Sequence, residues 1–310
     1  MGYEYYNNYK FDRCEYISDT EPVVPARPLR RVAVRVAIYE RSEAPRENKM
    51  NKNLCSLALS VFLSAVPFTS ALAADTTLRI GTEGAYPPFN YFTADGQLAG
   101  FDVEIGRALC AKLEAQCTFV AQDWDGIIPA LLAGKYDVII ASMFITDKRK
   151  AKVDFTHPYQ KSAMTFVVPK ESTLSDFSPQ GLAGKVLGAQ GSTTQGEYLS
   201  ALYPDSDVRL YPTQDAVNLD LVSGRLDAQV GDMIPMLDWT KKSADGSCCV
   251  LAGEPITDPQ YVGEGVGMAL RQEDDELRQK LNAALAEIVA DGTYKTINDK
   301  FFSVNILTLK

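Results

Sequence analysis

The residues that most often carry catalysis or bind metals are scarce in this sequence. His157 is its single histidine, and the segment Phe155-Thr156-His157-Pro158 is typical of a surface turn. The sequence contains no Ser–His–Asp arrangement for nucleophilic catalysis, no cluster of metal ligands and no glycine-rich phosphate loop. These absences disfavour several classes of enzyme, and we expect no cofactor and no metal.

A few polar residues have the chemistry to bind a small charged ligand, but alone they favour structural roles. Arg149 is the middle of three consecutive basic residues, which usually form a solvated surface. Asp232 follows an expected strand, where an aspartate most often caps a helix. Thr193 and Thr194 open an expected helix, whose first N–H groups could be capped, bind an anion, or do both.

The overall composition is that of a soluble globular protein. The chain has 310 residues, of which 46% are hydrophobic and 23% are charged. At about 100–200 residues per domain, this length allows two domains. The 31 basic and 40 acidic residues give a net charge of −9, which argues against a nucleic-acid partner.

The N-terminal part differs from the rest. An uncharged, mostly apolar run at 54–68 follows Met50-Asn51-Lys52 and precedes Ala71-Leu72-Ala73, the pattern of a secretory signal peptide at 50–73. The run is shorter than the about 20 residues that a membrane span needs. We interpret residues 1–49 as an upstream extension without a fold, either a misplaced start or a disordered tail. The mature chain then begins near Ala74, carries a net charge of −11 and is expected to be exported.

Four cysteines remain in the expected mature chain. Export places them in an oxidising compartment, where pairing is expected. Cys110 and Cys117 lie at a helix end and at the start of the next strand, so a short-loop disulfide is feasible. Cys248 and Cys249 are adjacent, and a bridge between neighbours is strained, so their state stays open.

Strand-like and helix-like segments alternate, as in an α/β protein. We expect strands at 78–81, 117–121, 136–141, 186–190, 208–211 and 227–230, and helices at 101–113, 127–133, 194–202, 215–223 and 274–291. The segment Ala133–Val138 resembles Ser223–Ala228, because each ends a helix with glycine and begins a strand with x-Asp-aliphatic. This repeat predicts two lobes of like construction.

An ordered set of motifs resembles the bacterial extracellular solute-binding proteins of family 3, the periplasmic receptors of amino-acid and opine ABC importers. The motifs run from 78–89 (LRIGTEGAYPPF) through 100–105, 124–129, 144–149, 184–194 and 265–271 to 290–294. The resemblance covers residues 76–304. The Cys110/Cys117 spacing is similar to the lysine/arginine/ornithine- and histidine-binding branch, which implies a disulfide there.

The resemblance implies a periplasmic-binding-protein type II fold, with two α/β lobes joined by a two-segment hinge and a ligand cleft between them. We place lobe 1 at 74–162 and 265–310, lobe 2 at 163–264, and the crossings near 161–164 and 263–267. The implied partners are a small-molecule amino acid and an ABC permease in the inner membrane. We expect the protein to act as a monomer.

The resemblance also assigns roles to nine ligand-binding positions. Arg149 matches the arginine that binds an α-carboxylate, a task for a planar bidentate donor, with donors added by Thr193 and Thr194. Asp232 matches the acceptor of the α-ammonium, and Ser142 offers a hydroxyl or a carbonyl to the ligand backbone. The ligand side chain is expected between Tyr86 and Trp124, with its distal end on Glu83, which favours arginine, lysine or ornithine. Phe144 lies beside the carboxylate.

Two departures from the family pattern bear on the ligand. Phe144 replaces a serine, threonine or glycine, which removes a hydroxyl and adds bulk, and Ala141 replaces another hydroxyl. Ala141 and the combination of Glu83 with Trp124-Asp125-Gly126 also occur in relatives that bind opines or cystine. The opine-binding relatives lack an acidic residue at the position of Asp232, because the nitrogen of an opine is substituted, so Asp232 favours an unsubstituted amino acid. We predict a receptor for a basic L-amino acid, including histidine, with an opine such as octopine or nopaline, or cystine or another polar amino acid, as the alternative.

A dehydratase on the same fold is the enzymatic alternative. Dehydratases that resemble this family use a glutamate a few residues after the position of Asp232. Here the segment Met233-Ile234-Pro235-Met236-Leu237 has no carboxylate. This difference favours transport over catalysis.

Overall fold

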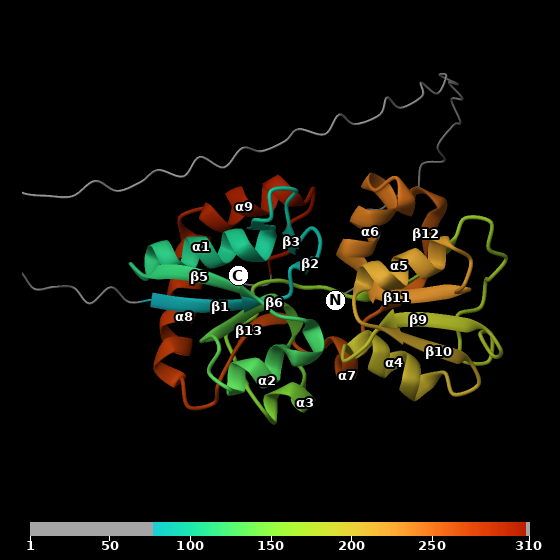
Figure 1. Ribbon diagram of the computed structural model, residues 1–310, viewed down its shortest axis with the longest axis horizontal. Coiled ribbons are helices and arrows are strands. Elements are labelled where there is room, and N and C mark those ends of the chain that lie inside the picture. The colour runs from blue at the N-terminus through green and yellow to red at the C-terminus, as the bar shows by residue number, and fades with distance from the viewer. Residues whose placement is uncertain (1–76, 308–310) are drawn as a thin grey trace, which may run out of the picture. The chain divides into compact units, whose positions relative to one another are not determined.

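The structure is a computed structural model, and it describes residues 77–307. The predicted extension at 1–49 and the predicted signal peptide at 50–73 lie outside the described residues. No helix within 77–307 is long and apolar enough to cross a membrane. The described part contains two five-stranded sheets with helices packed on them (Figure 1).

The first sheet has the strand order β5-β1-β6-β13-β7. Its strands are β1 (Thr77–Thr82), β5 (Gln116–Ala121), β6 (Val138–Phe144), β7 (Asp154–Phe155) and β13 (Val266–Leu270). β5, β1 and β6 are parallel, whereas β13 is antiparallel to both of its neighbours. Every residue of β6 and β13 is buried, which explains their continuous apolar character.

The second sheet repeats this plan in the order β10-β9-β11-β8-β12. Its strands are β8 (Met164–Pro169), β9 (Val186–Gln190), β10 (Asp207–Tyr211), β11 (Ala228–Asp232) and β12 (Cys249–Ile256). β10, β9 and β11 are parallel, and β8 runs antiparallel between β11 and β12. In each sheet, three parallel strands are therefore followed by two more strands, each antiparallel to the strand before it.

A small third sheet and the helices complete the described residues. The small sheet consists of β2 (Ala85–Tyr86), β3 (Asn90–Phe92) and β4 (Leu98–Ala99). The α-helices are α1 (Phe101–Lys112), α2 (Ile127–Leu132), α3 (Asp147–Lys150), α4 (Thr194–Leu202), α5 (Gln214–Val222), α6 (Met233–Lys242), α7 (Pro259–Val262), α8 (Asp275–Ala290) and α9 (Thr293–Phe301). Two short 3₁₀ helices lie at Trp124–Gly126 and Asp245–Cys248.

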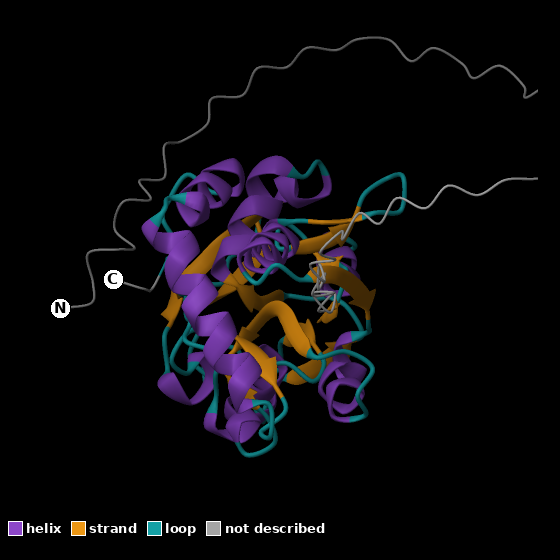
Figure 2. Ribbon diagram, turned by 90° about the vertical axis from the view of Figure 1, so that its left-hand side faces the viewer, coloured by secondary structure: helices purple, strands orange, loops and turns teal. Residues whose placement is uncertain are grey.

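Helices cover both faces of each sheet, as Figures 1 and 2 show. On the first sheet, α1, α8 and α9 pack on one face and α2 packs on the other. On the second sheet, α4 packs on one face, while α5 and α6 pack on the other. The predicted α/β class is confirmed, and the apolar positions of α8 that the sequence aligns on one face, such as Leu281, Leu285 and Ile288, are buried.

The repeated helix–glycine–strand joint occupies equivalent places in the two sheets. Gly134 follows α2 and precedes β6, and Gly224 follows α5 and precedes β11. Their φ angles are 72° and 69°, in the left-handed region that ends a helix at glycine. Like construction of the two lobes, predicted from this repeat, is therefore confirmed.

The chain passes between the sheets twice. It leaves the first sheet after β7, enters the second at Met164, and returns between Ile256 and Val266. Gln160 forms an isolated bridge with Val266, so the two passages lie side by side. The predicted crossings at 161–164 and 263–267 fall at the ends of these passages, and the predicted lobe boundaries stay a prediction.

The four described cysteines divide into two pairs. Cys110 near the end of α1 and Cys117 in β5 are joined in a disulfide, as predicted, with their Cα atoms 6.1 Å apart. Cys248 and Cys249 are free thiols with their sulfur atoms 3.0 Å apart. His157 is exposed, as the sequence predicts.

Candidate functional site

One pocket gathers the ends of strands from both sheets. Its lining residues are Glu83, Tyr86, Trp124, Ala141, Ser142, Phe144, Arg149, Gln190, Thr193, Thr194, Gln195, Gln214 and Asp232. All nine predicted ligand-binding residues are among them. Glu83 follows β1, and Phe144, Gln190 and Asp232 end β6, β9 and β11. The pocket thus lies at the carboxyl ends of the parallel strands, where open α/β sheets usually bind ligands.

Arg149 supplies the positive charge of the pocket. Thr146 caps α3 by accepting a hydrogen bond from the Arg149 N–H, which fixes the start of this short helix. The guanidinium donates to the Phe144 carbonyl at 3.0 Å, and its Cζ lies 5.4 Å from the centre of the Trp124 ring. Burial lowers the pKa of Arg149 to about 10, so it is still charged at neutral pH.

The two lysines on either side of Arg149 in the sequence each form an ion pair with a carboxylate. Lys148 forms an ion pair with Glu197 at 2.7 Å, and Lys150 pairs with Glu264. Within residues 77–307, no carboxylate forms an ion pair with Arg149. Its planar donor group therefore remains available for a carboxylate from outside the chain.

Asp232 supplies one of two negative charges. It is buried, and it accepts hydrogen bonds from the Tyr86 hydroxyl at 2.6 Å and from the Gln195 amide. Asp232 occupies the N-cap position of α6, yet its side chain caps no backbone N–H of that helix. Burial raises the pKa of Asp232 to about 6, against the opposing effect of its hydrogen bonds and of Arg149.

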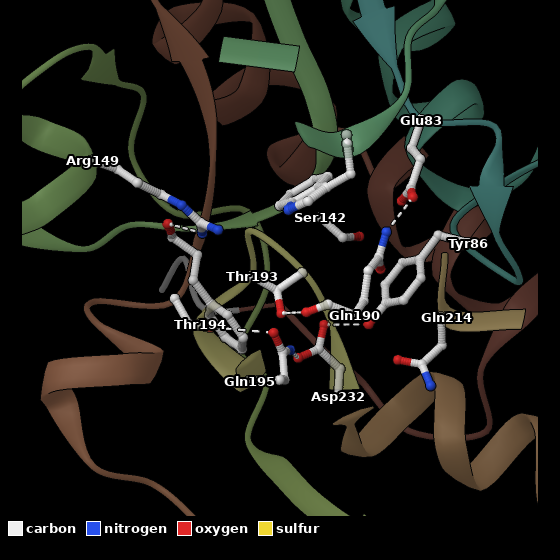
Figure 3. A pocket seen from close by; sticks show the side chains of 13 residues that line it. Glu83, Tyr86, Ser142, Arg149, Gln190, Thr193, Thr194, Gln195, Gln214 and Asp232 are labelled. Atoms are coloured by element: carbon white, nitrogen blue, oxygen red, sulfur yellow. Dashed lines mark hydrogen bonds between the residues drawn. The ribbon is translucent and has the colours of Figure 1, made fainter. Parts of the chain in front are cut away.

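Glu83 supplies the second negative charge. It is buried, and its carboxylate accepts a hydrogen bond of 2.6 Å from the Gln190 side chain. Burial, opposed by the hydrogen bond from Gln190 and aided by the nearby charges of Asp215 and Asp123, raises the pKa of Glu83 to about 7. In Figure 3 the Arg149 guanidinium and the Glu83 carboxylate lie on opposite sides of the pocket.

Aromatic groups and a helix start complete the walls. Trp124 donates from its indole N–H to the Ser192 carbonyl at 2.9 Å, a contact between the two lobes. Thr193 is the N-cap of α4, where its hydroxyl accepts from the Gly196 N–H at 3.1 Å, so the capping interpretation is confirmed. Thr194 is the first residue of α4. Anion binding by these N–H groups stays a prediction.

The Ser142 hydroxyl forms two hydrogen bonds inside the protein. It donates to Asp102 at 2.9 Å and accepts from Gln160 at 3.2 Å, so its proton is already used within the lobe. The carbonyl remains as the alternative that the sequence already offered. The φ of Ser142 is 51°, in the left-handed region that is uncommon for a serine.

The sequence profile of the bacterial extracellular solute-binding proteins, family 3, matches residues 78–304 of this chain. The chain belongs to this family. An L-arginine-binding protein of Pseudomonas aeruginosa is 46% identical over 255 residues, which cover 82% of this chain and 96% of that protein. The lysine/arginine/ornithine-binding periplasmic protein of Escherichia coli K12 is 36% identical over 259 residues, covering 83% of this chain and 99% of that protein.

Solved structures of family members have the same fold. A periplasmic binding protein of Salmonella typhimurium with high arginine specificity matches this chain with a TM-score of 0.68 and 32% identity. The match covers 74% of this chain and 100% of the Salmonella chain. The type II periplasmic-binding fold that the motifs implied is therefore confirmed.

Three polar residues of this solute-binding protein line the pocket although the sequence did not single them out. Gln190 lies within the motif at 184–194 and Gln195 follows it, and their only signal is a polar side chain next to a strand end or a helix start. Gln214 has the same weak signal, because it is the first residue of α5. Its amide donates to Asn218 and Gln229, and its oxygen faces the pocket (Figure 3).

The two departures from the family pattern both lie at the pocket. Phe144 is only 2% exposed and packs in the hydrophobic core, while its carbonyl holds Arg149. Ala141 is buried and packs with the residues around α2. The added bulk of Phe144 is therefore at least partly accommodated by the core. Residues 77–307 contain no group of three or more His, Cys, Asp or Glu residues that could hold a metal.

Proposed function

We propose that this protein is the periplasmic binding component of an ABC importer and that it captures a basic L-amino acid, with arginine as the preferred ligand. The observation that carries the proposal is the set of charges in the pocket: one guanidinium, Arg149, and two buried carboxylates, Asp232 and Glu83. A cationic amino acid carries the complementary set, one carboxylate and two positive groups. Transfer from water requires a partner for each of them.

The arrangement of the three charges defines an orientation for this ligand. Arg149 receives the α-carboxylate, and Asp232, held by Tyr86 and Gln195, accepts from the α-ammonium. Glu83 then binds the positive group at the end of the ligand side chain, on the other side of the pocket from Arg149 (Figure 3). The Trp124 ring, which already lies under the Arg149 guanidinium, is one wall along this path.

The neutral acceptors at the distal end favour arginine within the basic amino acids. Gln214 directs its side-chain oxygen into the pocket. Gln190 bonds Glu83 through its side-chain NH₂ group, which leaves its side-chain oxygen as an acceptor. A guanidinium has five N–H donors in a planar fork, whereas an ammonium has three. Several acceptors around one carboxylate suit the guanidinium better.

An opine fits this pocket less well than an unsubstituted amino acid. Its nitrogen carries a second substituent, and Asp232 is already in contact with Tyr86 and Gln195 on the protein side. Catalysis on this fold is not proposed, because the segment after Asp232 places Met233, Ile234 and Pro235 at the start of α6. The relatives named above are binding proteins.

Export and cellular location follow from the predicted signal peptide. We propose that residues 50–73 direct export, that the mature protein begins near Ala74 in the periplasm, and that it delivers its ligand to the permease as a monomer. We also keep the lobe boundaries proposed above, with lobe 1 at 74–162 and 265–310 and lobe 2 at 163–264. Relatives of this chain are periplasmic, which supports the location.

Calorimetric titration of the mature chain tests the proposal with arginine, lysine, ornithine, histidine, glutamine, cystine and octopine. We expect arginine to bind most tightly, and Arg149→Ala to abolish binding of every amino acid, since all of them share the α-carboxylate. Lys152→Ala is the matched control, because Lys152 is an exposed cation of the same basic segment and does not line the pocket. Binding of arginine by Arg149→Ala at wild-type affinity would contradict the proposal, and so would preferred binding of octopine or cystine.

A further inference from the structure

A buried carboxylate lies behind the pocket residues of the first lobe. Asp102 is the second residue of α1, is fully buried and does not line the pocket. It accepts hydrogen bonds from the Tyr159 hydroxyl at 2.6 Å, the Ser142 hydroxyl at 2.9 Å and the Asn90 amide at 3.0 Å. Three side chains from three different segments therefore converge on one group.

Two of these partners continue to segments that face the pocket. Asn90 accepts a hydrogen bond of 2.8 Å from the backbone N–H of Gly84, which lies between Glu83 and β2. Ser142 is itself a pocket residue, and its N–H lies 3.3 Å from the Tyr159 hydroxyl. The Asp102 network thus connects the loop that carries Glu83 with the strand that carries Ser142.

The network also holds backbone conformations that need support. Ser142 has a φ of 51°, which a serine rarely adopts, and Gly84 has a φ of 80°. Such conformations persist where the surrounding structure fixes them, and they are concentrated at functional sites. The bond from the Ser142 hydroxyl to Asp102 anchors this residue from inside the lobe, together with the contacts to Tyr159 and Gln160.

The network reaches the passage between the lobes as well. Tyr159 precedes Gln160, which donates to the Ser142 hydroxyl at 3.2 Å and forms the bridge to Val266. Asp102 therefore contacts, directly or through one neighbour, the Glu83 loop, the Ser142 strand and the first crossing segment.

We propose that Asp102 is a positioning residue for ligand binding, which holds Ser142 and the Glu83 loop in the geometry that receives the ligand. The inference rests on the proposed function, because the ligand is the one proposed for this pocket. A carboxylate is required by its chemistry: ionised aspartate only accepts, so it satisfies all three donors at once. An asparagine of the same shape must turn an NH₂ group towards at least one donor.

The first test compares Asp102→Asn with Asp137→Asn. Asp137 is also an acidic residue of the first sheet, bound to Arg79, but it precedes β6 at the end away from the pocket. We expect Asp102→Asn to raise the Kd for arginine by about tenfold or more, because a hydrogen-bonded charge is lost beside the site. Asp137→Asn should lower the Tm and leave the Kd within about twofold.

The second test separates positioning from loss of packing. In Ser142→Gly the backbone reaches a positive φ without help, so Asp102→Asn should cost less affinity there than in the wild-type chain. Non-additivity of this kind is the signature of two residues that act together. Equal losses in both backgrounds would overturn the proposal, as would an unchanged Kd in Asp102→Asn.

The third test does not depend on the ligand. Backbone N–H groups of Gly84 and Ser142 both donate within the network, and we expect both to exchange with deuterium faster in ligand-free Asp102→Asn than in the wild type and in Asp137→Asn. Unchanged exchange at both sites would overturn the positioning role. If the wild-type chain binds no amino acid, the proposed function fails, while the exchange comparison still decides whether Asp102 holds these segments.

Discussion

At the scale of single residues, the pocket contains two buried carboxylates. Burial raises the pKa of Glu83 to about 7 and that of Asp232 to about 6. A cationic ligand favours the ionised form of both groups, because opposite charges nearby lower a carboxyl pKa. Ligand binding near neutral pH is therefore coupled to the release of protons.

This coupling predicts a pH-dependent affinity with a defined sign. The Kd for arginine should rise as the pH falls from 8 to 5, first as Glu83 takes up a proton near pH 7 and then as Asp232 does so near pH 6. Each group that must lose a proton costs up to about tenfold in affinity per pH unit below its pKa. Calorimetric titration in a series of buffers measures the effect.

The Glu83→Gln variant tests whether Glu83 causes the change in Kd near pH 7. It should weaken arginine and lysine more than glutamine, and it should remove the change in Kd around pH 7. A profile that keeps its step near pH 7 in Glu83→Gln would show that another group titrates there.

The stability of the ligand-free protein should change in the opposite direction. A carboxyl whose folded pKa is raised binds more protons in the native state than in the unfolded state, where its pKa is about 4. Its contribution to stability is thus full at low pH and is lost as the pH rises from about 4 to 7. Asp102, whose pKa burial raises to about 6, adds to the same trend.

Residue types in the sequence indicated the charges of the site but not all of their contacts. The roles of Arg149 and Asp232 came from the family motifs, since a basic run and a residue after a strand favour surface and capping roles. The structure brings both to the pocket, where Asp232 contacts Tyr86 rather than the N–H groups of α6. The internal bonds of the Ser142 hydroxyl depend on Asp102 and Gln160, which are distant in sequence, so spacing alone does not reveal them.

At the scale of elements, the sequence predicts whether a segment is a helix or a strand better than it predicts where some of these segments begin and end. The helix at 194–202 was predicted with the bounds that α4 has, because a threonine cap marks its start. The strand predicted at 136–141 occupies 138–144 instead. Tyr136 remains in the preceding turn, where its hydroxyl donates to the Ile127 carbonyl, while antiparallel pairing with β13 extends the strand to Phe144. That pairing joins segments more than 120 residues apart, and local sequence carries no signal for it.

The disulfide between α1 and β5 leads to a prediction at this scale. Cys110 and Cys117 are seven residues apart, and closing so short a loop in the unfolded chain contributes about 2.5 kcal/mol in the loop-entropy description. The double variant Cys110→Ser/Cys117→Ser should therefore lower the Tm by roughly 5–10 °C in a thermal scan. Reduction of the wild type should have a similar effect.

The same variant should bind arginine normally. Cys117 pairs with Leu78 near the amino end of β1, whereas the pocket lies at the carboxyl ends of the parallel strands. A tenfold change in Kd on removing the disulfide would contradict this separation of stability from binding.

At the scale of the whole molecule, several contacts exist only where the two lobes meet. Lys148 in α3 pairs with Glu197 in α4, where the Lys148 side chain is largely exposed and that of Glu197 is partly exposed. The lobes of such folds open and close around their ligand. A pair that joins them is therefore present in the closed arrangement and lost on opening.

Reversing one of these charges should favour the open arrangement. Lys148→Glu places two carboxylates together and should weaken arginine binding by about two- to fivefold, the scale of an exposed pair. The double reversal Lys148→Glu/Glu197→Lys should restore the affinity, and high salt should reduce the difference between the variants. A loss that persists in the double reversal would place the effect elsewhere than in this pair.

The contact between Trp124 and Ser192 offers a way to measure the closure of the two lobes. The sequence has two tryptophans, and the second, Trp239, lies within α6 against the core of the second lobe. Trp124 alone reaches across the cleft, where its indole N–H donates to the Ser192 carbonyl at 2.9 Å and its ring lies beside the Arg149 guanidinium. Indole emission depends on polarity and on neighbouring charge, and opening the cleft changes both around Trp124. With Trp239 replaced by phenylalanine, the remaining tryptophan fluorescence comes from Trp124. It then reports closure of the lobes without an added label, from a residue that lines the proposed ligand site.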